Sequence, residues 1–272
     1  MLRRWVAAAA VLALGALPAA PASAAAVVDE TGPRSTTHFV ALGDSYMAGI
    51  GAGDYWERDG CRRSANSYAA LWAGQSAGTL TDLSCPGARV DDVAKRLPLV
   101  PPDADVLLVQ VGGNDVGFAA VAGACVIGGT SSCVGAADRA REQARRLPAR
   151  LTPLLRAARD KAPGARTLAL GYPTLVGTPS ACAASAVGSF ASAESVAALR
   201  RLQRALDAAV RLSARAAGVS YLDWPVAVNR HSLCSDDPWY VLPGTGRLDD
   251  LLHPTVDATQ AMAAHLGAQG SR

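Results

Sequence analysis

The stretch HFVALGDSYMAG, residues 38–49, changes its character halfway along. Residues 40–42 are apolar and typical of a buried strand, and Gly43 and Asp44 end that strand abruptly. Ser45 then stands where the strand gives way to what resembles the first turn of a helix. A serine at this position is either a helix N-cap, which accepts a backbone N–H, or a nucleophile at the edge of a sheet. The rest of the chain has to decide between these two interpretations.

The amino-terminal residues 1–24 are expected to be a signal peptide that is cleaved. Arg3 and Arg4 precede an apolar run over residues 6–17, and residues 22–24 (ASA) supply a small-residue cleavage site. The alternative is a transmembrane anchor, but the run is shorter than the ~20 apolar residues that a spanning helix needs. We therefore expect a secreted, extracellular protein.

One domain is expected after the leader. Residues 25–36 form a short extension, and residues 37–270 are long enough to enclose a sizeable core without a low-complexity linker or an internal repeat. The leader carries two arginines and no acid, so its removal lowers the formal net charge from +3 to +1. Such a small charge gives no electrostatic footprint for nucleic acid.

All six cysteines follow the leader, and an even number of cysteines in a secreted chain indicates disulfides. Cys125 and Cys133 flank a short glycine-rich loop and are expected to pair. Pairing in sequence order then gives the other two bonds, Cys61–Cys85 and Cys182–Cys234. The alternative, a metal site, is disfavoured because no CxxC motif occurs and the histidines do not cluster near the cysteines.

Apolar strands and amphipathic helices alternate along the chain. Five stretches are expected to be parallel strands: residues 38–42, 78–83, 105–111, 166–170 and 219–223. Helical patterns occupy residues 67–76, 137–161, 193–217 and 255–266. Pro148 and Pro153 must start, kink or break the second of these helices. This alternation predicts an α/β fold, a three-layer α/β/α sandwich around a five-stranded parallel sheet.

Polar and glycine residues follow the expected strands. The segments are residues 43–45 (GDS), 84–87 (SCPG), 112–115 (GGND) and 171–173 (GYP), and the loop after the fifth strand ends in residues 250–254 (DLLHP). Open parallel sheets bind ligands beyond the carboxyl ends of their strands. The sequence therefore predicts a functional site at this edge of the sheet.

A serine nucleophile at Ser45 needs a base, and His253 is the best candidate. It follows Asp250 by three residues and precedes a helix, so an Asp-x-x-His turn can bring the carboxylate to Nδ1 and leave Nε2 for the serine. The other histidines lie at the start of the first strand, in the loop before the last cysteine and in the last helix (His38, His231 and His265). The alternative for His253 is a surface histidine beside an acidic loop.

Negative charge that develops on a carbonyl oxygen needs fixed hydrogen-bond donors. The backbone N–H of Ser45, the backbone N–H of Gly87 and the carboxamide of Asn114 are candidates for such an oxyanion hole. Taken alone, Gly87 and Asn114 are ordinary turn residues. Three such loops in this order, followed by Asp-x-x-His, point to a common site.

With these motifs the chain resembles the SGNH hydrolases, the GDSL-type lipase and esterase family, particularly its secreted actinobacterial members. The four motif residues fall on Ser45 in GDSY, Gly87 in SCPGA, Asn114 in GGND and His253 in DLLHP. The similarity runs from about residue 37 to residue 267. It implies a flavodoxin-like sheet and a Ser–His(–Asp) hydrolase without metal or cofactor.

Two departures from the family pattern limit what the resemblance implies. Met47 and Ala48 replace the small polar residues that usually continue the first motif, which leaves the substrate open. Some members orient the histidine by a backbone carbonyl, but Asp250 stands at the usual carboxylate position and favours a full triad. The competing nucleophile elbow G-x-S-x-G is excluded because Met47 occupies its second glycine position.

We expect hydrolysis of carboxylic esters through an acyl-enzyme on Ser45, and lipids as the substrate, as in a triacylglycerol lipase or esterase. Alternatives are a phospholipase, a short-chain or carbohydrate O-acetyl esterase, and a non-catalytic secreted binding module. We further expect a monomer that contacts lipid surfaces transiently. Candidate pocket walls, for each of which core packing is the favoured explanation, are Tyr46, Met47, Trp56, Phe118, Trp239 and Tyr240.

Overall fold

The computed structural model describes residues 36–185, 191–242 and 244–270. The described residues from Thr36 onward belong to one compact unit. The expected leader, residues 1–24, and residues 25–35 of the expected extension lie outside the described residues. Across the described residues, every helix falls short of the length and apolarity that crossing a bilayer requires.

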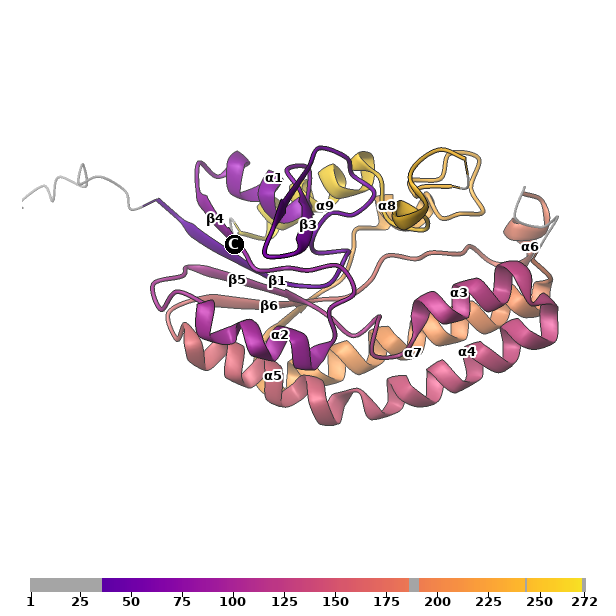
Figure 1. Ribbon diagram of the computed structural model, residues 1–272, viewed down its shortest axis with the longest axis horizontal. Coiled ribbons are helices and arrows are strands. Elements are labelled where there is room, and N and C mark those ends of the chain that lie inside the picture. The colour runs from indigo at the N-terminus through magenta and orange to yellow at the C-terminus, as the bar shows by residue number, and fades with distance from the viewer. Residues whose placement is uncertain (1–35, 186–190, 243, 271–272) are drawn as a thin grey trace, which may run out of the picture. The chain divides into compact units, whose positions relative to one another are not determined.

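Five parallel strands form the central sheet (Figure 1). In chain order they are β1 (His38–Gly43), β4 (Thr79–Asp82), β5 (Val106–Gln110), β6 (Arg166–Leu170) and β7 (Ser220–Leu222). Their order in the sheet is β4-β1-β5-β6-β7, and Val40 of β1 lies opposite Thr81 of β4 and Leu107 of β5. This is the 2-1-3-4-5 order of flavodoxin-like folds. The expected α/β fold with its five-stranded parallel sheet is confirmed.

Helices cover both faces of the sheet and create two cores (Figure 1). Val40 and Leu42 face the core beneath one helical layer, and Phe39 and Ala41 face the other, because alternate residues of a strand point to opposite sides. The first layer consists of α2 (Val90–Arg96), α5 (Pro148–Lys161) and α7 (Ala193–Ala217). The second consists of α1 (Tyr68–Gln75), α8 (Val226–Arg230) and α9 (Val256–Gly270).

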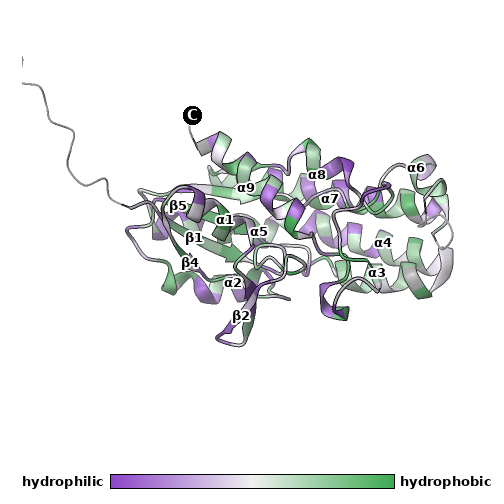
Figure 2. Ribbon diagram, turned by 90° about the horizontal axis from the view of Figure 1, so that it is seen from above, coloured by the Kyte–Doolittle hydropathy of each residue, from purple (hydrophilic) through white to green (hydrophobic). Residues whose placement is uncertain are grey.

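A group of helices extends past the carboxyl ends of the strands (Figure 1). Here α3 (Phe118–Ile127) and α4 (Gly129–Arg146) pack against each other, and α4 packs along α7. Buried residues recur every three or four positions in α7, and Figure 2 shows both apolar and polar segments in this helix. The remaining short elements are α6 (Pro179–Ala183) and two 3-10 turns, η1 (Leu97–Leu99) and η3 (Leu248–Asp250).

Two expectations about the helices need correction. The pattern over residues 137–161 is two helices, because α4 ends at Arg146 and Pro148 occupies the first turn of α5, where a missing N–H costs nothing. Pro153 lies inside α5 without ending it. The expected glycine-rich loop between Cys125 and Cys133 is the end of α3 and the start of α4, separated by a single residue, Gly128.

A β-hairpin was not expected from the sequence. β2 (Tyr55–Arg58) and β3 (Cys61–Ser64) pair antiparallel, and Asp59 and Gly60 connect them. Both connecting residues have positive φ, 55° and 70°, as a type I′ turn requires. The Asp-Gly pair was the available signal, since it is among the strongest short-range hairpin markers. This hairpin carries Arg62 to the functional site described below.

The structure joins the cysteines in sequence order, Cys61 to Cys85, Cys125 to Cys133 and Cys182 to Cys234. The first bond ties the β2–β3 hairpin to the loop after β4. The second joins α3 to α4, and the third holds α6 against the loop that follows α8. All three bonds therefore restrain segments outside the central sheet.

Replacing Cys182 and Cys234 by serine should destabilise the protein more than replacing Cys125 and Cys133. The first pair is separated by 52 residues and the second by 8. The entropy of loop closure then predicts losses of about 4 and about 2.5 kcal/mol. Denaturant titration of the two double-serine variants measures both free energies of unfolding, and equal losses or the reverse order would contradict this explanation.

Candidate active site

Ser45 and His253 meet at the carboxyl end of β1. Ser45 Oγ lies 2.8 Å from His253 Nε2, although 208 positions separate the residues in sequence. Ser45 begins a short helical turn in which Ile50 N–H donates to the Ser45 carbonyl, so the expected helix is only this turn. A Cβ on Gly43 would lie 2.3 Å from the Gln110 carbonyl oxygen, which explains the glycine before the turn.

His253 is oriented by a backbone carbonyl, and the expected contact with Asp250 is absent. Nδ1 of His253 lies 3.1 Å from the Leu251 carbonyl oxygen. Leu252 adopts a left-handed conformation with φ 61°, within the tight turn that joins this carbonyl to the ring. The hydrogen bond that the structure shows between His253 and Asp250 joins their backbones, with the His253 N–H donating to the Asp250 carbonyl oxygen at 3.1 Å. The prediction of an Asp250–His253 side-chain pair is therefore wrong in this geometry.

The Asp250 carboxylate is instead paired with Arg62 of the β2–β3 hairpin. Arg62 Nη2 donates to Asp250 Oδ1 at 2.5 Å, and the two side chains are only 14% and 9% exposed. The Arg62 guanidinium also stacks on the Tyr55 ring at 4.4 Å. This strong charge-assisted bond holds the carboxylate away from the imidazole. Asp250 thus anchors residues 250–254, the histidine loop, to the hairpin.

The environment of His253 favours its neutral form. Burial lowers the pKa of this imidazole below its ordinary value of 6.5, and the positive charge of Arg62 acts in the same direction. The Leu251 and Asp250 carbonyls and the Asp250 carboxylate oppose this shift. With Nδ1–H donated to Leu251, the neutral ring presents an unprotonated Nε2 to Ser45. Such a ring can accept the proton of the serine hydroxyl.

The three expected oxyanion donors line the same pocket as Ser45 and His253. Among the described residues, neither the Ser45 nor the Gly87 backbone N–H has a hydrogen-bond acceptor. Gly87 is exposed and has φ 79°, a conformation that favours glycine. Asn114 donates one amide hydrogen to the Ala88 carbonyl at 3.1 Å, which leaves the second for a ligand.

Tyr46 and Gly51 hold the histidine loop against the turn that begins at Ser45. The Tyr46 hydroxyl donates to the Leu252 carbonyl at 3.1 Å, and its ring lies 5.3 Å from the imidazole. A Cβ on Gly51 would lie 2.4 Å from the Pro254 carbonyl oxygen and 3.0 Å from the His253 Cβ. The absence of a side chain at Gly51 therefore permits the close approach of the two segments.

A pocket of about 680 Å³ opens beside Ser45, within the size range of small-molecule sites. Its apolar wall includes Ile50, Phe118, Ala122, Leu175, Leu206 and Leu252. Its charged residues are Asp44, Glu57, Arg62, Arg247 and Asp249. Of the expected wall residues, Tyr46 and Phe118 line the pocket, whereas Met47 and Tyr240 belong to the buried core.

The other aromatic and histidine candidates lie elsewhere. Trp56 is exposed on the hairpin, where Arg63 packs over its ring. His231 stacks on Trp239 with ring centroids 3.8 Å apart, and His38 Nε2 lies 2.8 Å from Thr81 Oγ1. In the part of the chain that the structure describes, no group of three or more His, Cys, Asp or Glu side chains is arranged to hold a metal ion.

Known proteins are similar to this chain in both sequence and fold. A model of the GDSL-like lipase/acylhydrolase family matches residues 41–261. A lipase from Streptomyces rimosus is 37% identical over 263 residues, which cover 94% of this chain and 93% of that protein. The crystal structure of phospholipase A1 from Streptomyces albidoflavus is 30% identical with a TM-score of 0.77, over 88% of this chain and all of that one. The crystal structure of the extracellular lipase from Streptomyces rimosus is 34% identical with a TM-score of 0.75, over 87% of this chain and 100% of that one.

The imidazole of His253 should titrate below pH 6.5, because burial disfavours its charged form. NMR of the ring carbon–proton signals measures this pKa, and His253→Asn assigns the resonance. In Arg62→Gln the same signal should titrate at higher pH, since a positive charge that opposes protonation is gone. A pKa above 6.5 in the unmodified protein would refute the proposed environment of this ring.

Proposed function

The chain belongs to the GDSL-like lipase/acylhydrolase family, and on that premise we propose that it is an exported lipase or esterase with Ser45 as its nucleophile. Family membership and similarity to Streptomyces lipases make it a carboxylic ester hydrolase, which leaves the alternative of a non-catalytic binding module without support. The observation that carries the assignment of Ser45 is its 2.8 Å hydrogen bond to His253 at the wall of the pocket.

In the first half of the reaction, Ser45 Oγ attacks the ester carbonyl carbon while His253 Nε2 takes the hydroxyl proton. The tetrahedral intermediate collapses as His253 gives that proton to the leaving alkoxide. An alcohol departs and the acyl group remains on Ser45. The Leu251 carbonyl fixes the ring orientation and stabilises the imidazolium, the part that a carboxylate plays in a full triad.

In the second half, water attacks the acyl-enzyme with His253 as its base, and Ser45 recovers its proton as the carboxylic acid leaves. In both halves negative charge develops on the former carbonyl oxygen. The N–H groups of Ser45 and Gly87 and the free amide hydrogen of Asn114 are the donors for it. All three residues line the pocket beside His253, which supports this assignment, because donors that are fixed before the reaction give strong electrostatic stabilisation.

Lipid esters are the proposed substrate class, with triacylglycerols and simple fatty esters first. The apolar pocket wall suits an acyl chain, and the similar proteins named above are lipases and a phospholipase A1. Arg62 and Arg247 also line the pocket and keep phospholipids as a second candidate, since guanidinium groups bind phosphate well. A sugar O-acetyl ester would leave most of the apolar wall unused.

The proposed site of action is outside the cell. The leader pattern, three disulfides and similarity to an extracellular lipase support export. A mature protein in the culture medium that begins near residue 25 would support it, and retention of the full chain in the cytoplasm would contradict it. We also propose that the enzyme acts as a monomer that touches lipid surfaces transiently.

A substrate panel tests the proposed substrate class. Esters of p-nitrophenol with acyl chains of two to sixteen carbons, triolein and phosphatidylcholine are assayed with Ser45→Ala as the blank. Long-chain esters should give the highest kcat/KM, because each buried CH₂ adds about 0.8 kcal/mol of binding. A preference for acetyl esters alone would contradict the lipid assignment, and turnover by Ser45→Ala would contradict the nucleophile.

Asp250→Asn should reduce kcat/KM by less than about tenfold, far from the ~10⁴-fold loss seen when a carboxylate that bonds the catalytic histidine is replaced. Its main effect should be on stability, because Arg62 loses its charged partner in a largely buried position. Thermal unfolding and steady-state kinetics separate the two effects. The double variant Arg62→Gln/Asp250→Asn is the control and should recover part of the lost stability. A loss of activity near 10⁴-fold in a folded Asp250→Asn protein would restore the full triad.

A further inference from the structure

We propose that Tyr172, in the loop after β6, is a positioning residue. It fixes the loop after β1, which carries Ser45 (the nucleophile loop), relative to the loop after β5, which carries Asn114 (the oxyanion loop). The inference rests on the proposed function, since it assigns a role around the same serine. Tyr172 lines the pocket, but its hydroxyl is directed to neighbouring protein groups. Its importance lies in which groups those are.

The Tyr172 hydroxyl makes two hydrogen bonds, one to each loop. It donates to Asp44 Oδ2 at 2.5 Å and accepts the Gly113 backbone N–H at 3.0 Å. Asp44 directly precedes the nucleophile, and Gly113 directly precedes Asn114. The oxygen of a single side chain therefore lies between the residues next to two members of the proposed site.

The loop after β4 is connected to the same network. Asn114 donates to the Ala88 carbonyl at 3.1 Å, and Ala88 follows Gly87, the second backbone donor. Tyr172 thus completes a chain of hydrogen bonds through the loops after β1, β4 and β5. Each of the three proposed oxyanion donors belongs to a residue that takes part in this hydrogen-bond network or to a neighbour of such a residue in the sequence.

The buried Asp44 carboxyl needs the Tyr172 hydroxyl as a hydrogen-bond partner. Asp44 is 2% exposed, and its other oxygen accepts the Tyr46 backbone N–H at 3.0 Å. Burial raises the pKa of Asp44 to about 7, and the bonds from Tyr172 and Tyr46 counter that rise. A buried polar group that loses a partner costs about 1–3 kcal/mol. Loss of the hydroxyl would leave both the carboxyl and the Gly113 N–H short of a partner, so both loops would rearrange.

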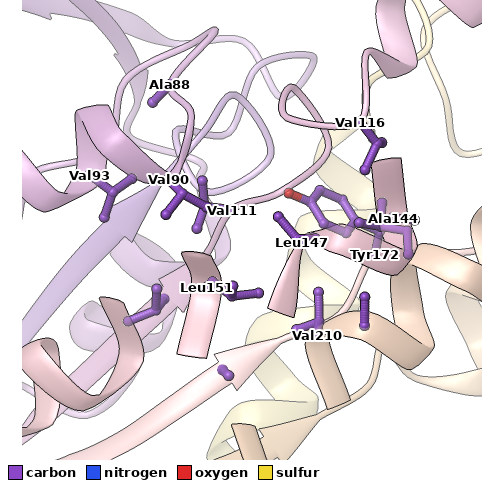
Figure 3. Packing of buried hydrophobic residues seen from close by; sticks show 14 of the residues in the cluster. Ala88, Val90, Val93, Val111, Val116, Ala144, Leu147, Leu151, Tyr172 and Val210 are labelled. Carbon is purple, nitrogen blue, oxygen red and sulfur yellow. The ribbon is translucent and has the colours of Figure 1, made fainter. Parts of the chain in front are cut away.

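Packing holds the ring independently of its hydroxyl. Figure 3 shows Tyr172 among the buried side chains of Val116, Ala144 and Leu147. The ring of Tyr46 packs edge-on against it, with centroids 5.3 Å apart, and a Cβ on Gly113 would lie 3.4 Å from the ring. Phenylalanine at this position keeps these contacts and removes only the two hydrogen bonds.

Tyr172→Phe should lower kcat by about tenfold to hundredfold, the loss typical of small misplacements, with KM changed by less than about threefold. The control is Ser213→Ala, which removes a buried hydroxyl and its 2.7 Å bond to the Ala209 carbonyl within α7, outside the pocket. Circular dichroism and thermal unfolding establish that both variants are folded. A Tyr172→Phe protein with unchanged kcat, or a Ser213→Ala protein with an equal loss, would overturn the proposal.

A double-mutant cycle with Asn114→Ala separates positioning from general destabilisation. Removal of that donor should itself lower kcat by about 10²–10³-fold. If Tyr172 acts partly by placing this donor, its replacement should lower kcat by a smaller factor in the Asn114→Ala background than in the unmodified protein. Full additivity would overturn the proposal. Failure of the proposed function would appear differently, as an Asn114→Ala variant with unchanged kcat.

Substitution of Asp44, the acceptor of the Tyr172 hydroxyl, provides an independent second test. Asp44→Asn keeps an acceptor for the Tyr172 hydroxyl, whereas Asp44→Ala removes it. The asparagine variant should therefore retain at least about tenfold more kcat than the alanine variant. Equal kcat in the two folded variants would show that the hydrogen bond does not position the loops.

Discussion

The hydrogen bond between Ser45 Oγ and His253 Nε2 is the contact on which the functional account depends. It joins the turn after β1 to the loop just before α9. The strand order β4-β1-β5-β6-β7 places the loops after β1, β4, β5 and β6 along one edge, as parallel strands require. The histidine loop reaches this edge through contacts with the turn that begins at Ser45, chiefly the bond from Tyr46 to the Leu252 carbonyl. The fold thus brings together two segments that lie 208 positions apart in the sequence.

The carbonyl that orients His253 changes the electrostatics of the site. A carboxylate at Nδ1 would hold a full negative charge beside the ring and stabilise its protonated form. Here the carboxylate of Asp250 is paired with Arg62, and Nδ1 of the ring faces the Leu251 carbonyl oxygen instead of a carboxylate. Burial therefore dominates and lowers the pKa of His253. The imidazole is therefore neutral at neutral pH, and in the proposed reaction its protonated form is less stabilised than it would be beside a carboxylate.

The sequence predicted the features that depend on local pattern or chain order. Apolar runs predicted the strands, and the residues that follow them predicted which loops would meet, so Ser45 and His253 were expected to lie together. Asp250 was misassigned because spacing alone does not show which cation reaches a carboxylate. Arg62 reaches Asp250 only because Asp59 and Gly60 turn the hairpin toward the site. The bond between Tyr172 and Asp44 joins positions 128 apart, and no local pattern in either segment indicates it.

Labelling with a fluorophosphonate tests the central claim most directly, because this reagent reacts with a serine whose hydroxyl a neighbouring base has activated. Mass spectrometry of the digested protein should find one adduct, on the peptide that contains Ser45. His253→Ala should abolish that adduct in a folded protein. An adduct on a different residue, or undiminished labelling of Ser45 in His253→Ala, would contradict the assignment of this pair.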